Sequence, residues 1–238
     1  MSKRAVVLAG GKGSRLRPYT VVLPKPLMPI GEYPILEVIL RQLAGQGFDH
    51  VTLAVNHQAE IIRAFCGEGS RWKIHIDYSL ETAPLSTIAP LRLIRDLPEN
   101  FLLMNGDVLT DLSMGRLYDE HVAQKRMFTI AASERTHVVD YGVLHASGNK
   151  LTGFEEKPHF QYLVSMGVYI VNRSVLDNVP AGKAYGFDNL MLDMLAQKHP
   201  VHVERYAGYW LDIGRVDDYM RAVDEFEQQR PHLLPDEK

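Results

Sequence analysis

Apolar runs and amphipathic stretches alternate along the first half of the chain. Residues 5–9 form a continuous apolar run that ends at two glycines, a pattern typical of a strand buried on both faces of a parallel sheet. Residues 35–44 carry apolar side chains at helical spacing, and residues 59–65 repeat that spacing. Further strand-like runs span residues 51–55, 74–78 and 101–104. This βαβ alternation predicts a doubly wound sheet.

The pattern changes after about residue 128. Short apolar runs separated by turn residues span 128–132, 142–145, 153–154 and 166–171. We expect these short strands to form a mixed sheet that extends the first one. Helical spacing returns over residues 188–197 and 216–229, and residues 231–238 are expected to fray as a tail. Since no linker or repeat interrupts this order, the sequence predicts a single domain over residues 1–230.

The composition excludes several classes of protein. The chain has 238 residues, of which 46% are hydrophobic, so it can bury a core without disulfides or a structural metal. Its formal net charge of −3 gives no overall basic field that would attract a nucleic acid polymer or a membrane surface. The apolar runs are too short to span a membrane or to form a signal-peptide core. Because the single cysteine, Cys66, has no partner for an internal disulfide, we expect a soluble cytoplasmic protein.

Positive charge is concentrated just after the first strand. A glycine-rich turn there lets backbone N–H groups approach an anion closely, and its glycines are Gly10, Gly11 and Gly13. The cations that accompany it, with no acid between them, are Lys12, Arg15, Arg17 and Lys25. Pro24 and Pro26 restrict the backbone on both sides of Lys25, which suits a cation presented at a set position. The spacing fits neither a Walker A loop nor a full dinucleotide fingerprint, and the alternative to a phosphate site is a solvated basic loop.

Carboxylates follow at two places. Asp107 comes soon after the strand predicted over residues 101–104, at the edge where open α/β sheets bind ligands, and it could hold Mg²⁺ beside phosphate oxygens. Asp212 is the candidate for a second carboxylate. The structural alternatives are that Asp107 caps the next turn and that Asp212 caps the last helix. Lys157, which precedes Pro158, is a second lysine held next to a proline.

Taken in this order, the motifs resemble those of the sugar-phosphate nucleotidylyltransferases from Ala5 to about Phe226. The matching segments are Gly10-Gly11-x-Gly13-x-x-x-Arg17-Pro18, Pro24-Lys25-Pro26, Asn105-Gly106-Asp107, Tyr141-Gly142-Val143, Glu155-Glu156-Lys157-Pro158, Met166-Gly167-Val168-Tyr169 and Trp210-x-Asp212-x-Gly214. The resemblance implies a Rossmann-like nucleotidyltransferase fold, an α/β fold with a three-layer, doubly wound, mixed and mostly parallel sheet. It also implies that residues 1–127 bind mainly the nucleotide and residues 128–215 mainly the sugar phosphate, with a C-terminal helix over 216–229.

The resemblance assigns roles to individual residues. Arg15 and Lys25 would be catalytic and hold the phosphates of a nucleoside triphosphate, and Asp107 and Asp212 would carry Mg²⁺. The remaining nucleotide contacts would come from Leu8, Ala9, Gly10, Gly11, Gly13, Glu81, Ser86, Thr87 and Gly106. The residues implied to bind the sugar 1-phosphate are Tyr141, Gly142, Glu156, Lys157 and Gly167. Among these, Lys157 would contact the phosphate.

The implied activity is nucleotidyl transfer from a nucleoside triphosphate to a sugar 1-phosphate, which yields a nucleotide sugar and pyrophosphate. The attacking phosphate has a second pKa of about 6 and is mostly ionised at neutral pH, so no general base is needed. None of the ten histidines therefore has to be catalytic. The main task is to position two polyanions and to neutralise the charge that develops between them, which fixed cations accomplish.

One segment departs from the family pattern. In residues 81–91, which stand where members usually contact the base, Ser86 replaces a glycine, and Ala89 and Pro90 stand where a glycine and a small residue are common. We therefore expect a base pocket of different width, and we favour GTP with a mannose- or heptose-like 1-phosphate. Uridylyl, thymidylyl or cytidylyl transfer to another sugar 1-phosphate stays open, as does a non-catalytic, nucleotide-sugar-binding regulatory subunit. Dimers and tetramers are common in the family, so a homo-oligomer is a further expectation.

Overall fold

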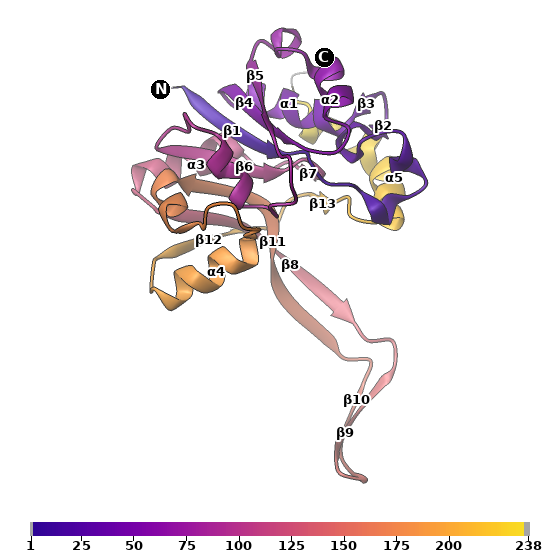
Figure 1. The fold of residues 1–238 in the computed structure, drawn as a ribbon. Coiled ribbons are helices and arrows are strands. Elements are labelled where there is room, and N and C mark those ends of the chain that lie inside the picture. Colours follow the sequence, from indigo (N-terminus) through magenta and orange to yellow (C-terminus); the bar gives the residue numbers. More distant parts are fainter. Residues whose placement is uncertain (1, 236–238) are drawn as a thin grey trace.

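The computed structural model describes residues 2–235, and a mixed seven-stranded sheet lies at its centre (Figure 1). Its four neighbouring parallel strands are β6 (Asn100–Asn105), β1 (Lys3–Leu8), β4 (Phe48–Val55) and β5 (His75–Leu80). β11 (His159–Asn172) runs antiparallel to β6 and to β8 (Phe128–Val138), and β12 (Val201–Tyr206) is parallel to β8 at the edge. The predicted sheet is therefore confirmed, and β8 and β11 extend it as the predicted strands 128–132 and 166–171. The expectation that residues 142–145 and 153–154 extend it as well is wrong, because these residues pair with each other in a separate two-stranded sheet.

Helices cover both faces of the sheet, which gives the predicted three layers. One face packs against α1 (Ile35–Gly45), α2 (Ala59–Cys66), α3 (Met114–Ala123) and α5 (Val216–Leu233). The other face packs against α4 (Phe187–Ala196) and the 3-10 helices η5 (Ala89–Leu93) and η6 (Arg173–Asn178). Side chains of β1 alternate between the two cores, with Ala5 and Val7 in the first and Val6 in the second. This burial on both faces explains the continuous apolar run of β1.

Shorter elements complete the fold. β2 (Pro29–Ile30) pairs with β3 (Tyr33–Pro34), and β7 (Val108–Thr110) pairs with β13 (Trp210–Asp212). The remaining 3-10 helices are η1 (Ser14–Leu16), η2 (Tyr19–Val21), η3 (Lys25–Leu27) and η4 (Ser70–Trp72). Within residues 2–235, none of the helices is both long enough and apolar enough to span a membrane.

Several elements differ from the sequence prediction. The apolar pattern did not predict α3, where a glycine and four polar residues interrupt the apolar positions. It did not predict β12 either, which lies at the edge of the sheet and pairs with one neighbouring strand, β8. α5 continues to Leu233 instead of ending at residue 229, because Leu233 and Leu234 are buried in the core. The expected fraying over residues 231–238 is therefore wrong for residues 231–234, while residues 236–238 lie outside the described part of the chain.

β8 and β11 are much longer than predicted, and they leave the sheet together as a projecting two-stranded ribbon (Figure 1). Their pairing stays in register from Glu134 with Leu163 to Val138 with His159. A hairpin of β9 (Gly142–Ser147) and β10 (Lys150–Glu156) forms the outer end. We call residues 134–163 the arm and the rest of the described chain the body. The arm has no core of its own. The runs over residues 142–145 and 153–154 predicted parts of β9 and β10, but no apolar run marks the extension of β8 and β11 into the arm.

Candidate active site

The carboxyl ends of β1 and β6 bring the glycine-rich loop and Asp107 together. Leu8 pairs with Asn105 at the ends of these parallel strands, and the Gly106 amide donates a hydrogen bond to the Leu8 carbonyl at 2.9 Å. A Cβ on Gly106 would lie 2.8 Å from that carbonyl oxygen, so glycine is required for this close approach. Asp107 therefore lies directly beside the start of the loop.

The loop after β1 keeps most of its charge at the surface. Ala9 is buried, and its amide donates to the Ala54 carbonyl at 2.8 Å. Gly10 and Gly13 are half-buried, and the Thr20 hydroxyl donates to the Gly13 carbonyl at 2.7 Å, which closes the turn. The exposed residues of the loop are Gly11, Lys12, Ser14, Arg15 and Arg17. The predicted cations other than Lys25 are thus accessible to an anion.

Lys25 is the buried cation of this loop. It begins η3 after an extended Pro24, and 8% of its surface is exposed. Its Nζ forms an ion pair with Asp107 Oδ2. A buried ammonium needs such a partner, since an unpaired charge is costly away from water. The flanking prolines therefore restrict the backbone that holds Lys25 against Asp107.

A short strand pair brings Asp212 to the same place. β13 pairs with β7, which sets Asp212 opposite Val108, and the Ile213 amide donates to the Asp107 carbonyl at 3.0 Å. Asp212 does not cap α5, because the N-cap residue is Arg215. The two carboxylates therefore belong to one cluster, and we call Lys25, Asp107 and Asp212 the charged cluster.

Negative charge in this cluster is incompletely balanced. Partial desolvation and then the neighbouring Asp107 charge raise the pKa of the Asp212 carboxyl, while Lys25 and Arg15 lower it. Asp107 Oδ1 is buried, and within residues 2–235 no group donates a hydrogen bond to it. A Cβ on Gly214 would lie 3.7 Å from Arg15 Nη2, so this guanidinium also lies near the cluster. Two carboxylates with an unsatisfied buried oxygen fit the donor set that Mg²⁺ prefers.

The segment predicted to contact the base is tied to the start of α4. Glu81 follows β5, and its carboxylate accepts a hydrogen bond from the Leu85 amide. Thr87 Oγ1 accepts one from the Phe187 amide at 2.9 Å, at the first residue of α4. Ser86 has a left-handed φ of 68°, so this serine is held in a conformation that glycine adopts more readily. The side chains of Glu81 and Thr87 thus shape the loop itself.

Gly167 is set against the end of β6 by an irregularity in β11. The register between β8 and β11 shifts between Ser165 and Tyr169, and Gly167 takes a φ of 73° there. A Cβ at this position would lie 2.6 Å from Asn105 Nδ2. Gly167 therefore packs against the residue that lies two positions before Asp107.

The other residues predicted to bind the sugar phosphate lie on the arm. Gly142 pairs with Glu156 between β9 and β10, and a Cβ on Gly142 would lie 3.2 Å from Glu156 Oε2. Tyr141 is 79% exposed, and Lys157 is exposed as well. Figure 1 shows β9 and β10 at the far end of the arm, well away from β7 and β13. Within one chain, these four residues lie on one hairpin but not beside the charged cluster.

Arg135, which the sequence did not single out, anchors the root of the arm. Its guanidinium donates a hydrogen bond to the Trp210 carbonyl at 2.8 Å. The same guanidinium also stacks over the side chain of Trp210, 4.4 Å from the ring centre. The indole Nε1 donates in turn to the Met166 carbonyl at 2.9 Å. Because Trp210 begins β13, the arm leaves the body close to Asp212.

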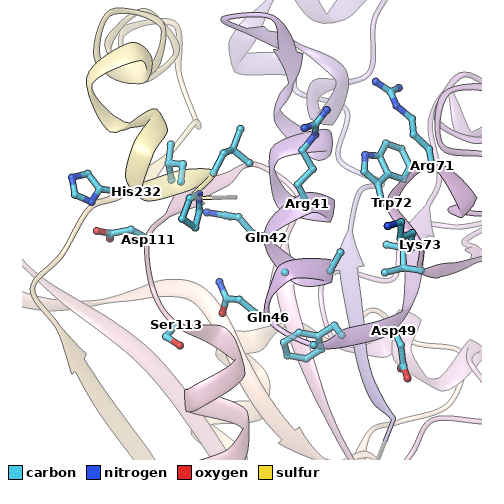
Figure 2. A pocket seen from close by; sticks show the side chains of 18 residues that line it. Arg41, Gln42, Gln46, Asp49, Arg71, Trp72, Lys73, Asp111, Ser113 and His232 are labelled. Carbon is cyan, nitrogen blue, oxygen red and sulfur yellow. The ribbon is translucent and has the colours of Figure 1, made fainter. Parts of the chain in front are cut away.

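Two further features could bind a ligand, and neither includes the predicted residues. A pocket of about 860 Å³ is lined by residues 45–49 and by Trp72 and Asp111, among others (Figure 2). Residues 45–49 lead into β4, so this pocket lies at the amino ends of the parallel strands, opposite the charged cluster. His50, His75 and Asp77 place ligand atoms within 4.8 Å of one another.

The carboxylate of that histidine cluster is already paired with an arginine. Arg4 Nη2 donates to Asp77 Oδ2 at 2.9 Å, and His50 Nε2 lies 3.1 Å from the same oxygen. The guanidinium therefore supplies the positive charge that a metal ion would otherwise bring. We assign this cluster to the structure of the sheet.

Comparison with known proteins gives a family match over most of the chain. A family model described as nucleotidyl transferase matches residues 4–229. A UTP–glucose-1-phosphate uridylyltransferase of Synechocystis is 31% identical over 241 residues, which cover 92% of this chain and 62% of the relative. A mannose-1-phosphate guanyltransferase of Yarrowia lipolytica is 31% identical over 230 residues, which cover 92% of this chain and 63% of the relative. The chain thus spans about three fifths of the length of these two relatives.

Other matches extend over nearly the whole of both chains. A D-glycero-α-D-manno-heptose 1-phosphate guanylyltransferase of Aneurinibacillus thermoaerophilus is 29% identical over 226 residues, which cover 94% of this chain and 98% of the relative. The crystal structure of HddC from Yersinia pseudotuberculosis, complexed with GMP-PN, superposes with a TM-score of 0.72 at 24% identity. That superposition covers 94% of this chain and 99% of HddC, and it shows a common fold.

Proposed function

Because the chain belongs to the nucleotidyl transferase family, we propose that it transfers a nucleotidyl group from a nucleoside triphosphate to a sugar 1-phosphate and releases pyrophosphate. The observation that carries the proposal is the Lys25–Asp107 ion pair beside Asp212, at the mouth of a glycine-rich, cationic loop. Curated relatives that match 92–94% of the chain are named for this kind of transfer. A fixed cation that is paired with one carboxylate and close to a second suits phosphate chemistry that needs charge neutralisation and no general base.

In this proposal, different cations of the loop bind different phosphates of the nucleoside triphosphate. Lys12 and Arg15 are exposed at the mouth, where they would bind the outer phosphates that leave as pyrophosphate. Lys25 has three N–H donors, and the ion pair with Asp107 uses one of them. The others remain for an oxygen of the phosphate under attack, where negative charge builds in the transition state.

Asp107 and Asp212 would hold Mg²⁺, which supplies charge neutralisation and orientation for the triphosphate when it is bound. Two observations support this assignment. Asp107 Oδ1 lacks a hydrogen-bond donor from the described residues, and the charge of Asp107 raises the pKa of Asp212. A divalent cation would satisfy the oxygen and favour the ionised form of Asp212.

For the substrates, we propose GTP and a 1-phosphate of a mannose-configured sugar. The manno-heptose guanylyltransferase of Aneurinibacillus thermoaerophilus matches along 98% of its own length, whereas the uridylyltransferase of Synechocystis matches along 62%. In the loop that we propose contacts the base, Ser86 has a positive φ, so the backbone keeps a conformation that glycine usually permits. Uridylyl transfer is the alternative, because the Synechocystis relative is named for it.

The experiment is a pyrophosphate-release assay with Mg²⁺, the four common nucleoside triphosphates and a panel of sugar 1-phosphates. We expect turnover with GTP and a manno-configured 1-phosphate, and GTP should raise the melting temperature more than UTP, CTP or dTTP does. Turnover with UTP and with no other triphosphate would show that the enzyme transfers a uridylyl group and not the proposed guanylyl group. No turnover with any pair, in a sample that unfolds cooperatively, would overturn the proposed activity.

A further inference from the structure

The arm carries large apolar side chains that nothing in the described chain covers. Tyr141 is 79% exposed, Leu144 is 65% exposed and Phe154 is 57% exposed. The other exposed apolar residues of the arm are Val138, Leu151, Phe160, Tyr162 and Leu163. Leu144 and Phe154 pair across β9 and β10, so at least these two lie side by side. Large exposed apolar side chains gathered on one segment mark an interaction site.

The arm also lacks neighbours along its strands. Among the described residues, β9 and β10 pair with each other alone, and β12 pairs with β8 over residues 128–133 and not beyond. An isolated two-stranded ribbon is at best marginally stable in water, because it has no second layer to bury its apolar face. The arm therefore needs a surface to pack against.

The regular pairing of the ribbon holds Lys157 away from its own body. The pairs between Glu134 and Val138 of β8 continue into the Val139 amide, which donates to the Pro158 carbonyl at 3.1 Å. At about 3.3 Å per residue, this pairing sets Lys157 roughly 20 Å beyond the root of the arm. The root itself is fixed by Arg135 on Trp210, close to Asp212. Lys157 cannot reach the charged cluster of its own chain unless this pairing breaks.

The body exposes a matching apolar surface next to the cationic loop. Tyr19, Val21 and Val22 follow Arg17 and are 48%, 59% and 76% exposed. Lys25 comes three residues after Val22, so this surface borders the charged cluster along the chain. An apolar arm that docks here would bring its lysine to the place where the body offers triphosphate contacts and, of the residues predicted to bind the sugar phosphate, has Gly167 but not Lys157 or Glu156.

We propose that two copies of this chain exchange arms, so that Lys157 and Glu156 of each copy complete the sugar-phosphate site of the other. The role of the site in this inference rests on the proposed function. The exchange itself rests on the exposed apolar side chains of the arm and on the β8–β11 pairing that holds the arm away from its own body. The arm has about 30 residues, which fits the roughly 20–30 residues that each partner contributes to a standard interface. Two reciprocal contacts related by a two-fold axis make a closed dimer, with no surface left to propagate.

The first test uses pairs of differently tagged chains, one carrying Lys25→Ala and the other Lys157→Ala. The pairs are co-expressed, purified through both tags and assayed at a limiting sugar 1-phosphate concentration. With exchanged arms, one of the two sites receives intact Lys25 from its body and intact Lys157 from the other arm. The mixed pair should therefore recover about half of the wild-type rate, although each variant alone is nearly inactive.

The matched control combines Lys25→Ala with Asp212→Asn, because both residues lie in the body. No site in that pair regains both groups, so it should stay inactive. A Lys25→Ala and Lys157→Ala pair that stays as inactive as its parents, while wild type is active, would overturn the exchange and mean that the arm folds onto its own body. Failure to recover any pair through both tags would overturn it as well.

A second measurement does not depend on activity. Wild type should have the mass of two chains in sedimentation or light scattering, and Leu144→Ser on the arm should shift it to one chain. Leu192→Ser is the matched control, since Leu192 lies on α4 of the body with the same 65% exposure. A single-chain mass for wild type, or an equal response to both substitutions, would overturn the proposal. If wild type pairs in this way but releases no pyrophosphate, the proposed function fails and the exchange stands.

Discussion

β8 passes through two regions of the molecule that differ in what supports them. In the body, residues 128–133 are almost all buried between β11 and β12, whereas in the arm residues 134–138 are largely exposed on a two-stranded ribbon. The charged cluster lies at the ends of strands that are buried in the core, and Lys25 itself is buried, whereas the hairpin with Glu156 and Lys157 has no core of its own. The body can therefore hold its charges in a fixed arrangement, while the position of the arm depends on what covers it.

The largest loss of activity that this comparison predicts follows a substitution in the charged cluster of the body. Asp107→Ala should reduce pyrophosphate release by about a thousandfold or more, because it removes the carboxylate shared by Lys25 and the proposed Mg²⁺ site. The melting temperature should stay within a few degrees of wild type, since Lys25 then has Asp212 as a nearby counter-ion. Retention of most activity would remove Asp107 from the site.

Lys25→Ala tests how far the cation at this site stabilises the two neighbouring carboxylates. This change leaves Asp107 and Asp212 facing each other without their cation, so the pKa of Asp212 should rise further. The stability lost relative to wild type should therefore grow as the pH rises and both carboxyls ionise. Urea unfolding at acidic and neutral pH measures this difference, and an equal loss at both pH values would contradict the coupling between the two carboxylates.

The next effect concerns the arm. Lys157→Ala should raise the KM for the sugar 1-phosphate by about tenfold to a hundredfold, because one charge-assisted phosphate contact is lost. The KM for the triphosphate and the melting temperature should not change, since Lys157 is exposed and packs in no core. Equal losses for both substrates would show that the division of phosphates between body and arm is wrong.

The same comparison explains which parts of the fold could be predicted from sequence. β1, β4 and β6 are buried on both faces, so most of their residues are apolar and form runs that can be recognised in the sequence. β8 and β11 were predicted as short strands, because apolar residues mark only their buried halves. In the arm, exposed apolar and polar side chains alternate with turn residues, and no local pattern reveals that the strands continue.

The site divides in the same way. The rule that ligands bind at the carboxyl ends of strands predicted Asp107 beside the glycine-rich loop, and the structure brings them together. The placement of Asp212 depends on the pairing of β13 with β7, and that of Arg135 on a contact with Trp210. Such long-range contacts have no local signature in a single sequence. The binding roles of all these residues stay predictions.

A pair of glycine substitutions sharpens the contrast in packing. Gly167→Ala places a Cβ 2.6 Å from Asn105 Nδ2 at a positive φ, so it should destabilise the protein by about 2 kcal/mol. Gly142→Ala places a Cβ equally close to the Phe154 ring, but that ring is 57% exposed and can turn away. Its cost should stay below about 1 kcal/mol in urea unfolding. Similar costs for both would mean that the arm is packed as tightly as the body.

The smallest predicted effect tests the buried end of β8 through a histidine. Burial, aided by the charges of Arg126 and His202, lowers the pKa of His121 to about 4, and its ring lies 2.8 Å from Thr129 Oγ1 and 3.2 Å from Asn100 Oδ1. The unfolded chain, with an ordinary histidine pKa of about 6.5, binds the proton first as the pH falls, so this stability is present above pH 6.5 and lost toward pH 4. Between pH 6.0 and 5.0, wild type should lose about 1 kcal/mol more than His121→Gln in urea unfolding, because the variant has no group to titrate at this position. An equal loss in both proteins would mean that His121 keeps its proton affinity on folding, and that the buried end of β8 is less tightly packed than its burial indicates.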